Sequence, residues 1–500
     1  MNNGTQRTGK TFIGVSAIIF ISKLLGFLRD VVFASIFGTT ILTDLFQLIF
    51  SFPGYLFTSI GTALSSVNIP DLTYYINSRT REERDRYLSN LFAQISLWAS
   101  LLCLLGIVFA PLLTRVIAPG LNDEVIDLAV LLTRIMIPTL LFVSLTYVAA
   151  GVLQVHGHFL LSSSISIPFN LLVIASLLIK GVDIVFLGYI TTIGWLLQFF
   201  IQFPVLWKEK YHFFWRIDFK NEHTMLMFKQ LGPILLGNSL LQLCLIIDRS
   251  FASHLEEGTI GALGFGSNLF VTITSVFIVA MSTVIFPRLS QYCLDNDKAR
   301  IRSLLSNIFK ILLFILLPYL ILVVCYHREI ISLVYERGAF TSESTSMSSI
   351  AFLGYSFAVV GYACQEIFNR VYYALKKFTV PMRVSMLCIF LKLLLDFLLF
   401  RTAGIIGISL STAFCLLLYA LIMSILLHRE IGNFLSKDLM HFIVQLGLPI
   451  AGMLAIILGS SFLQIGGRLV FLLPLVVSGL VYLGIAYFNS IIRETILVRE

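Results

Sequence analysis

The sequence has 500 residues, of which 58% are hydrophobic and 12% are charged, and its formal net charge is +8. Ordinary globular domains contain about 25% charged residues, so this composition and the mean hydropathy of +0.92 exclude a soluble multidomain enzyme and indicate a polytopic membrane protein. The seven cysteines are scattered without a C-x-x-C pair, so neither a metal site nor a disulfide framework is predicted.

Runs of about 20 apolar residues predict an all-α protein with fourteen transmembrane helices. They start near residues 12, 41, 88, 124, 159, 183, 225, 259, 305, 344, 381, 404, 440 and 467. Polar residues interrupt the runs around 225–255 and 344–375. The first run has no small-residue cleavage site, so we expect a retained helix and not a signal peptide.

The lysines and arginines orient these helices. If the N-terminus is cytoplasmic, 22 of the 35 lie in loops on the cytoplasmic side, seven lie on the opposite side, and the others lie within spans. This bias predicts that both termini are cytoplasmic. The net positive charge therefore reflects membrane topology and not nucleic-acid binding.

Residues 4–11, GTQRTGKT, match the phosphate-binding pattern G-x-x-x-x-G-K-[ST]. That motif requires a preceding strand and a following helix in an α/β domain. Only three residues precede Gly4, and an apolar span follows. We therefore interpret the segment as a polar cytoplasmic tail and predict no ATP site.

The first span contains three charged residues within the segment SKLLGFLRD, residues 22–30. A charge at the centre of a membrane helix costs about 2.5–3.5 kcal/mol on insertion scales. Lys23 and Asp30 are seven residues apart and share nearly one helix face, with Ser22, Gly26 and Arg29 on a neighbouring strip. This polar band predicts the lining of a cavity.

Other predicted spans also contain polar or charged residues. These are Asp44, Arg134, Asn238, Gln242, Asp248, Lys310, Gln365, Glu366, Arg370, Lys392 and Asp396. Asp44, Lys310 and Arg370 lie near span ends, where reaching the membrane interface is an equally good explanation. Lys392 and Asp396, four residues apart, fit a structural ion pair or a substrate contact. Pro53-Gly54 and Gly232-Pro233 predict bends in the second and seventh spans.

Three weak sequence matches indicate an internal duplication. DVVFAS at 30–35 matches DRSFAS at 248–253, NIPDL at 68–72 matches IFPRL at 285–289, and Asn170 aligns with Lys392. The offsets are 218, 217 and 222 residues. Spans 1–6 and 7–12 are therefore predicted to be two halves that enter the membrane in the same direction, as in parallel-repeat transporters.

SKLLGFLRDVVFASIFG at 22–38 closely resembles the first-helix signature of the MurJ/MviN lipid II flippases, members of the multidrug/oligosaccharidyl-lipid/polysaccharide exporter superfamily. The similarity continues in TDLF at 43–46, GVLQVHGHF at 151–159, ERGAFT at 336–341, NRVYYALKKFTVP at 369–381 and GIIGISLST at 404–412. The resemblance implies a flippase of the bacterial cytoplasmic membrane, not an enzyme, that serves peptidoglycan and cell-wall synthesis.

The resemblance also implies a domain organisation and a substrate site. It implies six-helix lobes over 1–222 and 223–430, and two C-terminal helices over 431–500 that form a groove for the lipid tail. A cationic central cavity would hold the pyrophosphate of an undecaprenyl-linked sugar. We expect a monomer that works by alternating access, without ATP or another cofactor.

Position by position, the resemblance implies roles for individual residues. Arg29 and Asp30 match an essential Arg-Asp pair, Lys23 stands where an arginine is usual, and Asp44 matches an aspartate of the second span. The predicted substrate-binding set is Ser22, Lys23, Arg29, Asp30, Asp44 and Asn268.

Some family members bind sodium in the second lobe, and their ligands match Asp248, Asp396, Thr412 and the carbonyl of Ile408. The remaining ligand, usually Asn, is Lys392 here. We therefore predict no sodium site, or an impaired one. The membrane potential is the expected driving force, since it favours outward movement of an anion by about 2.3 kcal/mol per charge per 100 mV.

Two family features are absent. YLFTSIGTAL at 55–64 lacks the charged residues usual there, and Ser267 or Asn268 replaces a cavity arginine. These departures leave open a flippase for another polyprenyl-diphosphate oligosaccharide, such as an O-antigen, capsule or teichoic-type precursor. A drug or cation antiporter would need an acidic cavity, and no residue cluster at catalytic spacing favours an enzyme.

Overall fold

The computed structural model describes residues 2–51, 72–76, 78–214, 217–295, 297–434, 437–462, 471–489 and 492. Every regular element in these ranges is a helix, which confirms the all-α prediction. By length and hydropathy, eight of the described helices can cross a membrane, or ten if each of two bent pairs is one span. Pro53-Gly54 and the segment 55–64 lie outside the described residues.

The chain divides into two compact units. The first comprises Met1–Gly261 and Arg337–Phe340, and the second comprises Ala262–Glu336 and Thr341–Glu500. These units group residues that lie close together in space, whereas the predicted lobes are the two halves of the predicted sequence duplication. The lobe boundaries at 222 and 430 therefore stay a prediction.

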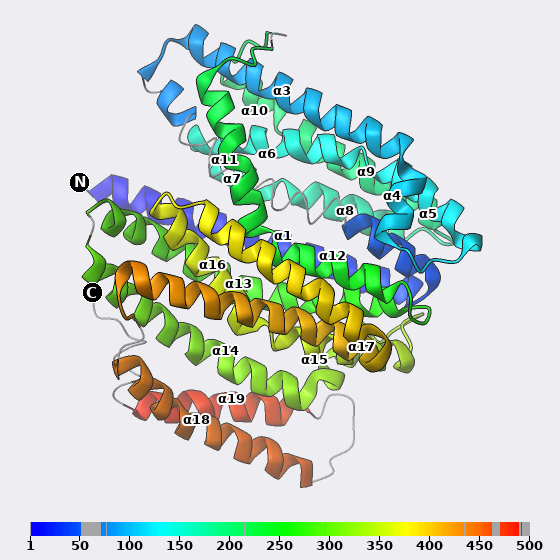
Figure 1. Ribbon diagram of the computed structural model, residues 1–500, viewed down its shortest axis with the longest axis vertical. Helices are drawn as coiled ribbons and strands as arrows, with labels where there is room; N and C mark the ends of the chain where they lie inside the picture. Colours follow the sequence, from blue (N-terminus) through cyan, green and yellow to red (C-terminus); the bar gives the residue numbers. More distant parts are fainter. Residues whose placement is uncertain are drawn as a thin grey trace. The chain divides into compact units, whose positions relative to one another are not determined.

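In the first unit, α1 packs against α7 and α8, α3 packs against α6, and α6 packs against α9 (Figure 1). A short apolar helix over Ile41–Ser51 follows α1. The helices are α1 (Asn2–Phe37), α3 (Arg81–Val108), α4 (Ala110–Ile117), α5 (Asp123–Met136), α6 (Thr139–Val155), α7 (Phe159–Ser164), α8 (Ser166–Leu177), α9 (Ile184–Phe200), α10 (Phe203–Lys208), α11 (Glu222–Asn238) and α12 (Leu240–Ala252). The GTQRTGKT segment is part of α1 and so does not form the loop that a phosphate-binding motif requires.

In the second unit, α14 packs against α15 and α18, α16 packs against α17, and α18 packs against α19 (Figure 1). The helices are α13 (Thr259–Leu294), which begins at the end of the first unit, α14 (Lys298–Tyr335), α15 (Ser342–Ser356), α16 (Val359–Ala374), α17 (Thr379–Ile431), α18 (Lys437–Phe462) and α19 (Leu472–Phe488). Each of the fourteen predicted start positions except 467 lies in or beside a described helix, and 467 falls outside the described residues.

Polar side chains fix the starts of several helices. Thr80 and Glu83 form a reciprocal capping box at the start of α3. Asp183, Asp297 and Thr341 accept hydrogen bonds from backbone N–H groups in the first turns of α9, α14 and α15. Each cap pairs an N–H group that has no partner within its own helix.

The two segments that polar residues interrupt are the two bent helix pairs. The axes of the α11 and α12 portions of the first pair differ by 61°, and those of α15 and α16 differ by 46°. Pro233 lies inside α11, and the break comes later, at Ser239. The Ser239 hydroxyl donates to the Leu235 carbonyl at 2.5 Å, and such a bond bends helices.

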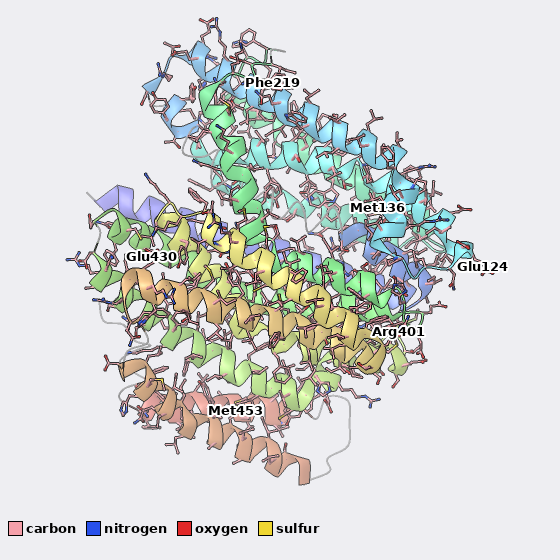
Figure 2. The ribbon with its side chains drawn as sticks, viewed as in Figure 1. Glu124, Met136, Phe219, Arg401, Glu430 and Met453 are labelled. Atoms are coloured by element: carbon pink, nitrogen blue, oxygen red, sulfur yellow. The ribbon has the colours of Figure 1, made fainter. Side chains whose placement is uncertain are left out.

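Gly404 divides α17 into two arms. The 53-residue element would be about 80 Å long if straight, far beyond the ~30 Å hydrocarbon core. Gly404 has φ 53° and ψ −136°, and the chain reverses there, since the Cys415 thiol reaches the Cys388 carbonyl at 3.4 Å. Figure 2 shows Arg401 near this turn and Glu430 at the far end of the second arm.

The backbone at Gly404 gives a first prediction. Gly404→Ala lowers the free energy of unfolding by about 1–3 kcal/mol, because this backbone conformation is strained for any residue with a Cβ atom. A Cβ at Gly404 would contact nothing within 4 Å, so the cost is conformational and not steric. Thermal unfolding of the purified protein in detergent measures the change.

Gly459→Ala is the matched control. Gly459 also has open space around it but lies within α18, where alanine stabilises the helix by about 0.5–1 kcal/mol. Equal melting temperatures for the Gly404→Ala and Gly459→Ala variants would contradict the assignment of the turn to Gly404.

Candidate functional site

Arg29 and Asp30 form an ion pair in the second half of α1. The Arg29 Nε and Nη2 atoms donate to Asp30 Oδ1 at 3.1 and 2.8 Å. From α8, the Asn170 Oδ1 atom accepts a third hydrogen bond from Arg29 Nη1 at 3.3 Å. The structure therefore brings the predicted Arg-Asp pair together and adds an amide from a helix distant in sequence.

The guanidinium of Arg29 retains binding capacity. An arginine has five N–H donors, and these bonds use three of them. The two other N–H groups have no hydrogen-bond partner among the described residues. Because the Arg29 side chain is 18% exposed, a ligand with anionic oxygens can reach the group.

Two aromatic rings flank the same guanidinium. The Cζ atom of Arg29 lies 5.4 Å from the ring centroid of Phe50 and 5.4 Å from that of Phe169. Such cation–π contacts hold a guanidinium in place without using its N–H donors. Together with Asp30 and Asn170, the rings orient Arg29 and leave part of its hydrogen-bonding capacity open.

Ser22 and Lys23 lie about two turns before this pair. The Ser22 hydroxyl donates to the Ser163 carbonyl at 3.3 Å, and the Ser22 carbonyl accepts from Asn170 Nδ2 at 3.5 Å. Ser22 is therefore buried in the contact of α1 with α7 and α8, while Lys23 is half-buried. The Asn170 side chain therefore contacts both Ser22 and Arg29, which lie about two helical turns apart in the predicted polar band.

Asp44 has its carboxylate engaged by backbone groups. Its Oδ2 and Oδ1 atoms accept from the N–H groups of Gly258 and Gly261 at 2.7 and 2.6 Å, so the carboxylate caps the start of α13. Nearby, the Ile41 N–H donates to Glu257 Oε1 at 2.9 Å. Asp44 is 3% exposed, and its role in substrate binding stays a prediction.

In the second unit, Lys392 and Asp396 form a fully buried ion pair within α17. Lys392 Nζ donates to Asp396 Oδ1 and Oδ2 at 2.6 and 2.5 Å and to Ser411 Oγ at 2.7 Å, and it lies 3.4 Å from the Ile408 carbonyl. The Ser411 hydroxyl also contacts Asp396 Oδ1. Both charged side chains have no exposed surface, and the two arms of α17 supply all four residues.

The other predicted site residues lie in both units. Asp248 is fully buried on α12 of the first unit, and Thr412 is fully buried on α17 of the second. Asn268 lies on α13 in the second unit and is partly exposed. Their predicted roles stay predictions.

The sequence reasoning missed several residues at these groups. The sequence analysis identifies Asn170 only as the repeat partner of Lys392, although a lone amide in the apolar run SIPFNLLVIASL is itself a signal. Phe50 and Phe169 are inconspicuous among 43 phenylalanines. The resemblance points to Thr412 and not to its neighbour Ser411, whose hydroxyl donates to the Ile408 carbonyl three residues earlier in the same helix.

Comparisons with known proteins agree with these observations. The sequence profile of the family described as "Lipid II flippase MurJ" matches residues 33–478. A "Probable lipid II flippase MurJ" of Buchnera aphidicola subsp. Acyrthosiphon pisum is 30% identical over 415 residues, which cover 80% of each chain. The "Lipid II flippase MurJ" of Burkholderia cenocepacia is 24% identical over 460 residues, which cover 89% of each chain.

Solved structures show a similar fold. A structure described as lipid II flippase MurJ in an inward closed conformation has a TM-score of 0.81 at 24% identity, covering 97% of this chain and 100% of that chain. An inward-facing multidrug resistance MATE family transporter of the MOP superfamily has a TM-score of 0.66 at 14% identity, covering 85% of this chain and 99% of that one.

The Asp44 cap gives a second prediction. Asp44→Ala lowers the free energy of unfolding by about 2–4 kcal/mol, because two buried N–H groups lose their acceptor. Asp44→Asn, which keeps one carbonyl oxygen, loses about half as much. Chemical denaturation of the protein in detergent gives both values.

Glu257→Ala serves as the control for Asp44. Glu257 is exposed and accepts one N–H, so its loss changes the unfolding free energy by less than about 1 kcal/mol. If Asp44→Ala unfolded at the same denaturant concentration as wild type, the capping role would be wrong.

Proposed function

The chain belongs to the lipid II flippase MurJ family, and from that premise we propose that it moves lipid II from the inner to the outer leaflet of the bacterial inner membrane. Lipid II is the undecaprenyl-diphosphate-linked precursor of peptidoglycan. The protein is an integral membrane transporter of cell-wall synthesis, and we assign it no catalytic step.

The observation that carries the proposal is that the Arg29 guanidinium is held in place by its neighbours and still has hydrogen-bond donors to offer. A guanidinium inside a membrane-spanning helix is costly, yet this one is oriented by Asp30 and Asn170 and keeps two N–H donors unused among the described residues. A diphosphate offers oxygen acceptors that match such donors. In the proposed mechanism Arg29 binds the diphosphate, Lys23 adds a second positive charge, and Asp30 moderates the affinity so that the substrate can leave.

We further propose the topology that the charge distribution predicts. In this arrangement fourteen helices cross the membrane, both termini are cytoplasmic, and the lobes over 1–222 and 223–430 move against each other in a monomer. The bias of lysines and arginines toward one set of loops supports this orientation. With this topology, the Asp44 cap lies on the outer side, where its hydrogen bonds hold the start of α13 against the Ile41–Ser51 helix.

The lipid tail is proposed to lie along the C-terminal helices. In the second unit an apolar cavity of about 240 Å³ lies among α14, α16, α17 and α18. Its lining includes Leu313, Phe368, Leu421, Leu439 and Ile443. An apolar groove beside α18 can hold part of an isoprenoid chain while the polar headgroup stays at Arg29.

The membrane potential is the proposed driving force. The diphosphate is anionic, and a potential that is negative inside favours its outward movement by about 2.3 kcal/mol per charge per 100 mV. This drive gives a direction to transport without a nucleotide or another cofactor.

Arg29 gives a third prediction. Arg29→Ala lowers the rate of lipid II flipping by about 10- to 100-fold, since a hydrogen bond to a charged group contributes about 1.5–3 kcal/mol. Arg29→Lys retains part of the activity, because it keeps the charge and loses the planar fork. The measurement is complementation of a bacterium depleted of its own lipid II flippase, with membrane levels checked, followed by flipping assays in proteoliposomes.

Arg401→Ala is the matched control, because Arg401 is exposed near the turn of α17 and lies outside the proposed site. Full flipping by Arg29→Ala at normal membrane levels would refute the role of Arg29. If the wild-type chain failed to complement but flipped another polyprenyl-diphosphate oligosaccharide, the substrate assignment would be wrong and the transport mechanism would stand.

A further inference from the structure

The ammonium group of Lys392 lies in a cage of oxygen atoms. Both carboxylate oxygens of Asp396 lie 2.5–2.6 Å from Nζ, the Ser411 hydroxyl lies at 2.7 Å, and the Ile408 carbonyl lies at 3.4 Å. Lys392 and Asp396 have no exposed surface. Carboxylate, hydroxyl and carbonyl oxygens converging on one positive centre are the ligand set that proteins offer to a hard metal cation.

The cage does not fit a free cation while Lys392 is charged. The similarity to sodium-binding family members implies ligands at Asp396 and the Ile408 carbonyl, and both already contact the ammonium group. A sodium ion placed among the same oxygens would lie next to a like charge in a buried site, where repulsion is poorly screened. The residues present therefore do not fit sodium.

We propose that Lys392 is a tethered cation that permanently takes the place of an exchangeable one. The aliphatic stem of the lysine delivers a compact positive charge to a position that a free ion would otherwise have to reach from solution. The site is then filled as soon as the chain folds, and its occupancy is independent of the sodium concentration.

The proposal that Lys392 replaces a free cation predicts a result that an ordinary structural ion pair does not. If the oxygens form a cation cage, removal of the ammonium group leaves Asp396, Ser411 and the Ile408 carbonyl arranged around an empty centre, and a free monovalent cation binds there. If Lys392 and Asp396 only pack against each other, the variant collapses or recruits water and gains no cation affinity.

The test compares the wild-type protein with Lys392→Asn, in which a short amide replaces the ammonium group and adds one more oxygen. Both are purified in detergent, and equilibrium binding of ²²Na⁺ is measured in choline chloride buffer. We expect no saturable binding to wild type and saturable binding to Lys392→Asn of one ion per chain, at least about tenfold above wild type. The double variant Lys392→Asn/Asp396→Asn, without the carboxylate, is the control and should not gain binding.

Melting temperatures give a second readout. The melting temperature of wild type should be the same in sodium and choline chloride, whereas that of Lys392→Asn should rise with sodium. If Lys392→Asn folds only when sodium is present during purification, that dependence supports the cage. If neither sodium nor potassium restores its folding while Lys392→Met/Asp396→Asn folds normally, the cage is refuted.

Saturable sodium binding to wild type, or a folded Lys392→Asn variant without added affinity, would also overturn the proposal. The binding assay contains no lipid substrate, so its outcome is independent of the proposed flippase activity. If Arg29 variants did not affect transport, the inference about Lys392 would still stand. If the sodium-binding test failed, the proposed role of Arg29 would still stand.

Discussion

A charge buried within a protein must find a partner that replaces water, and this constraint shapes two charged groups among the described residues. Arg29 is paired with Asp30 on the same helix, and Lys392 is paired with Asp396 one helical turn away. The first pair remains partly exposed and leaves donors unused among the described residues, whereas the second is enclosed. The same physical requirement therefore produces one group, at Arg29, that can bind a ligand, and another, at Lys392, whose hydrogen bonds are made within the protein.

Under the predicted internal duplication, the two groups occupy related positions. Asp30 aligns with Asp248 at an offset of 218 residues, and Asn170 aligns with Lys392 at an offset of 222. In the first half the cation is on the first span and the fifth span contributes an amide. In the second half, Lys392 stands at the position that corresponds to the Asn170 amide, and Lys392 is itself the positively charged residue.

The sequence predicted the features that depend on local pattern. Apolar runs predicted the helices, polar interruptions coincided with the two bent pairs, and the family resemblance implied the Arg29–Asp30 pair. The contacts of Asn170 and Phe169 with Arg29 were not predictable, because they depend on how α8 packs against α1. The Asp44 cap was missed for a further reason, since its partners are backbone N–H groups and leave no trace in residue identity.

The turn at Gly404 places Lys392, Asp396, Ile408 and Ser411 on one helical hairpin. During synthesis this hairpin is made before α18 and α19, so the lysine and its carboxylate and hydroxyl partners do not depend on those later helices. Arg29 has Asp30 beside it from the start, but Asn170 follows 141 residues later, a delay on the order of ten seconds at typical elongation rates. All four residues of the enclosed group are therefore present once this hairpin has been made, whereas Arg29 gains its amide partner only after α8 has been made.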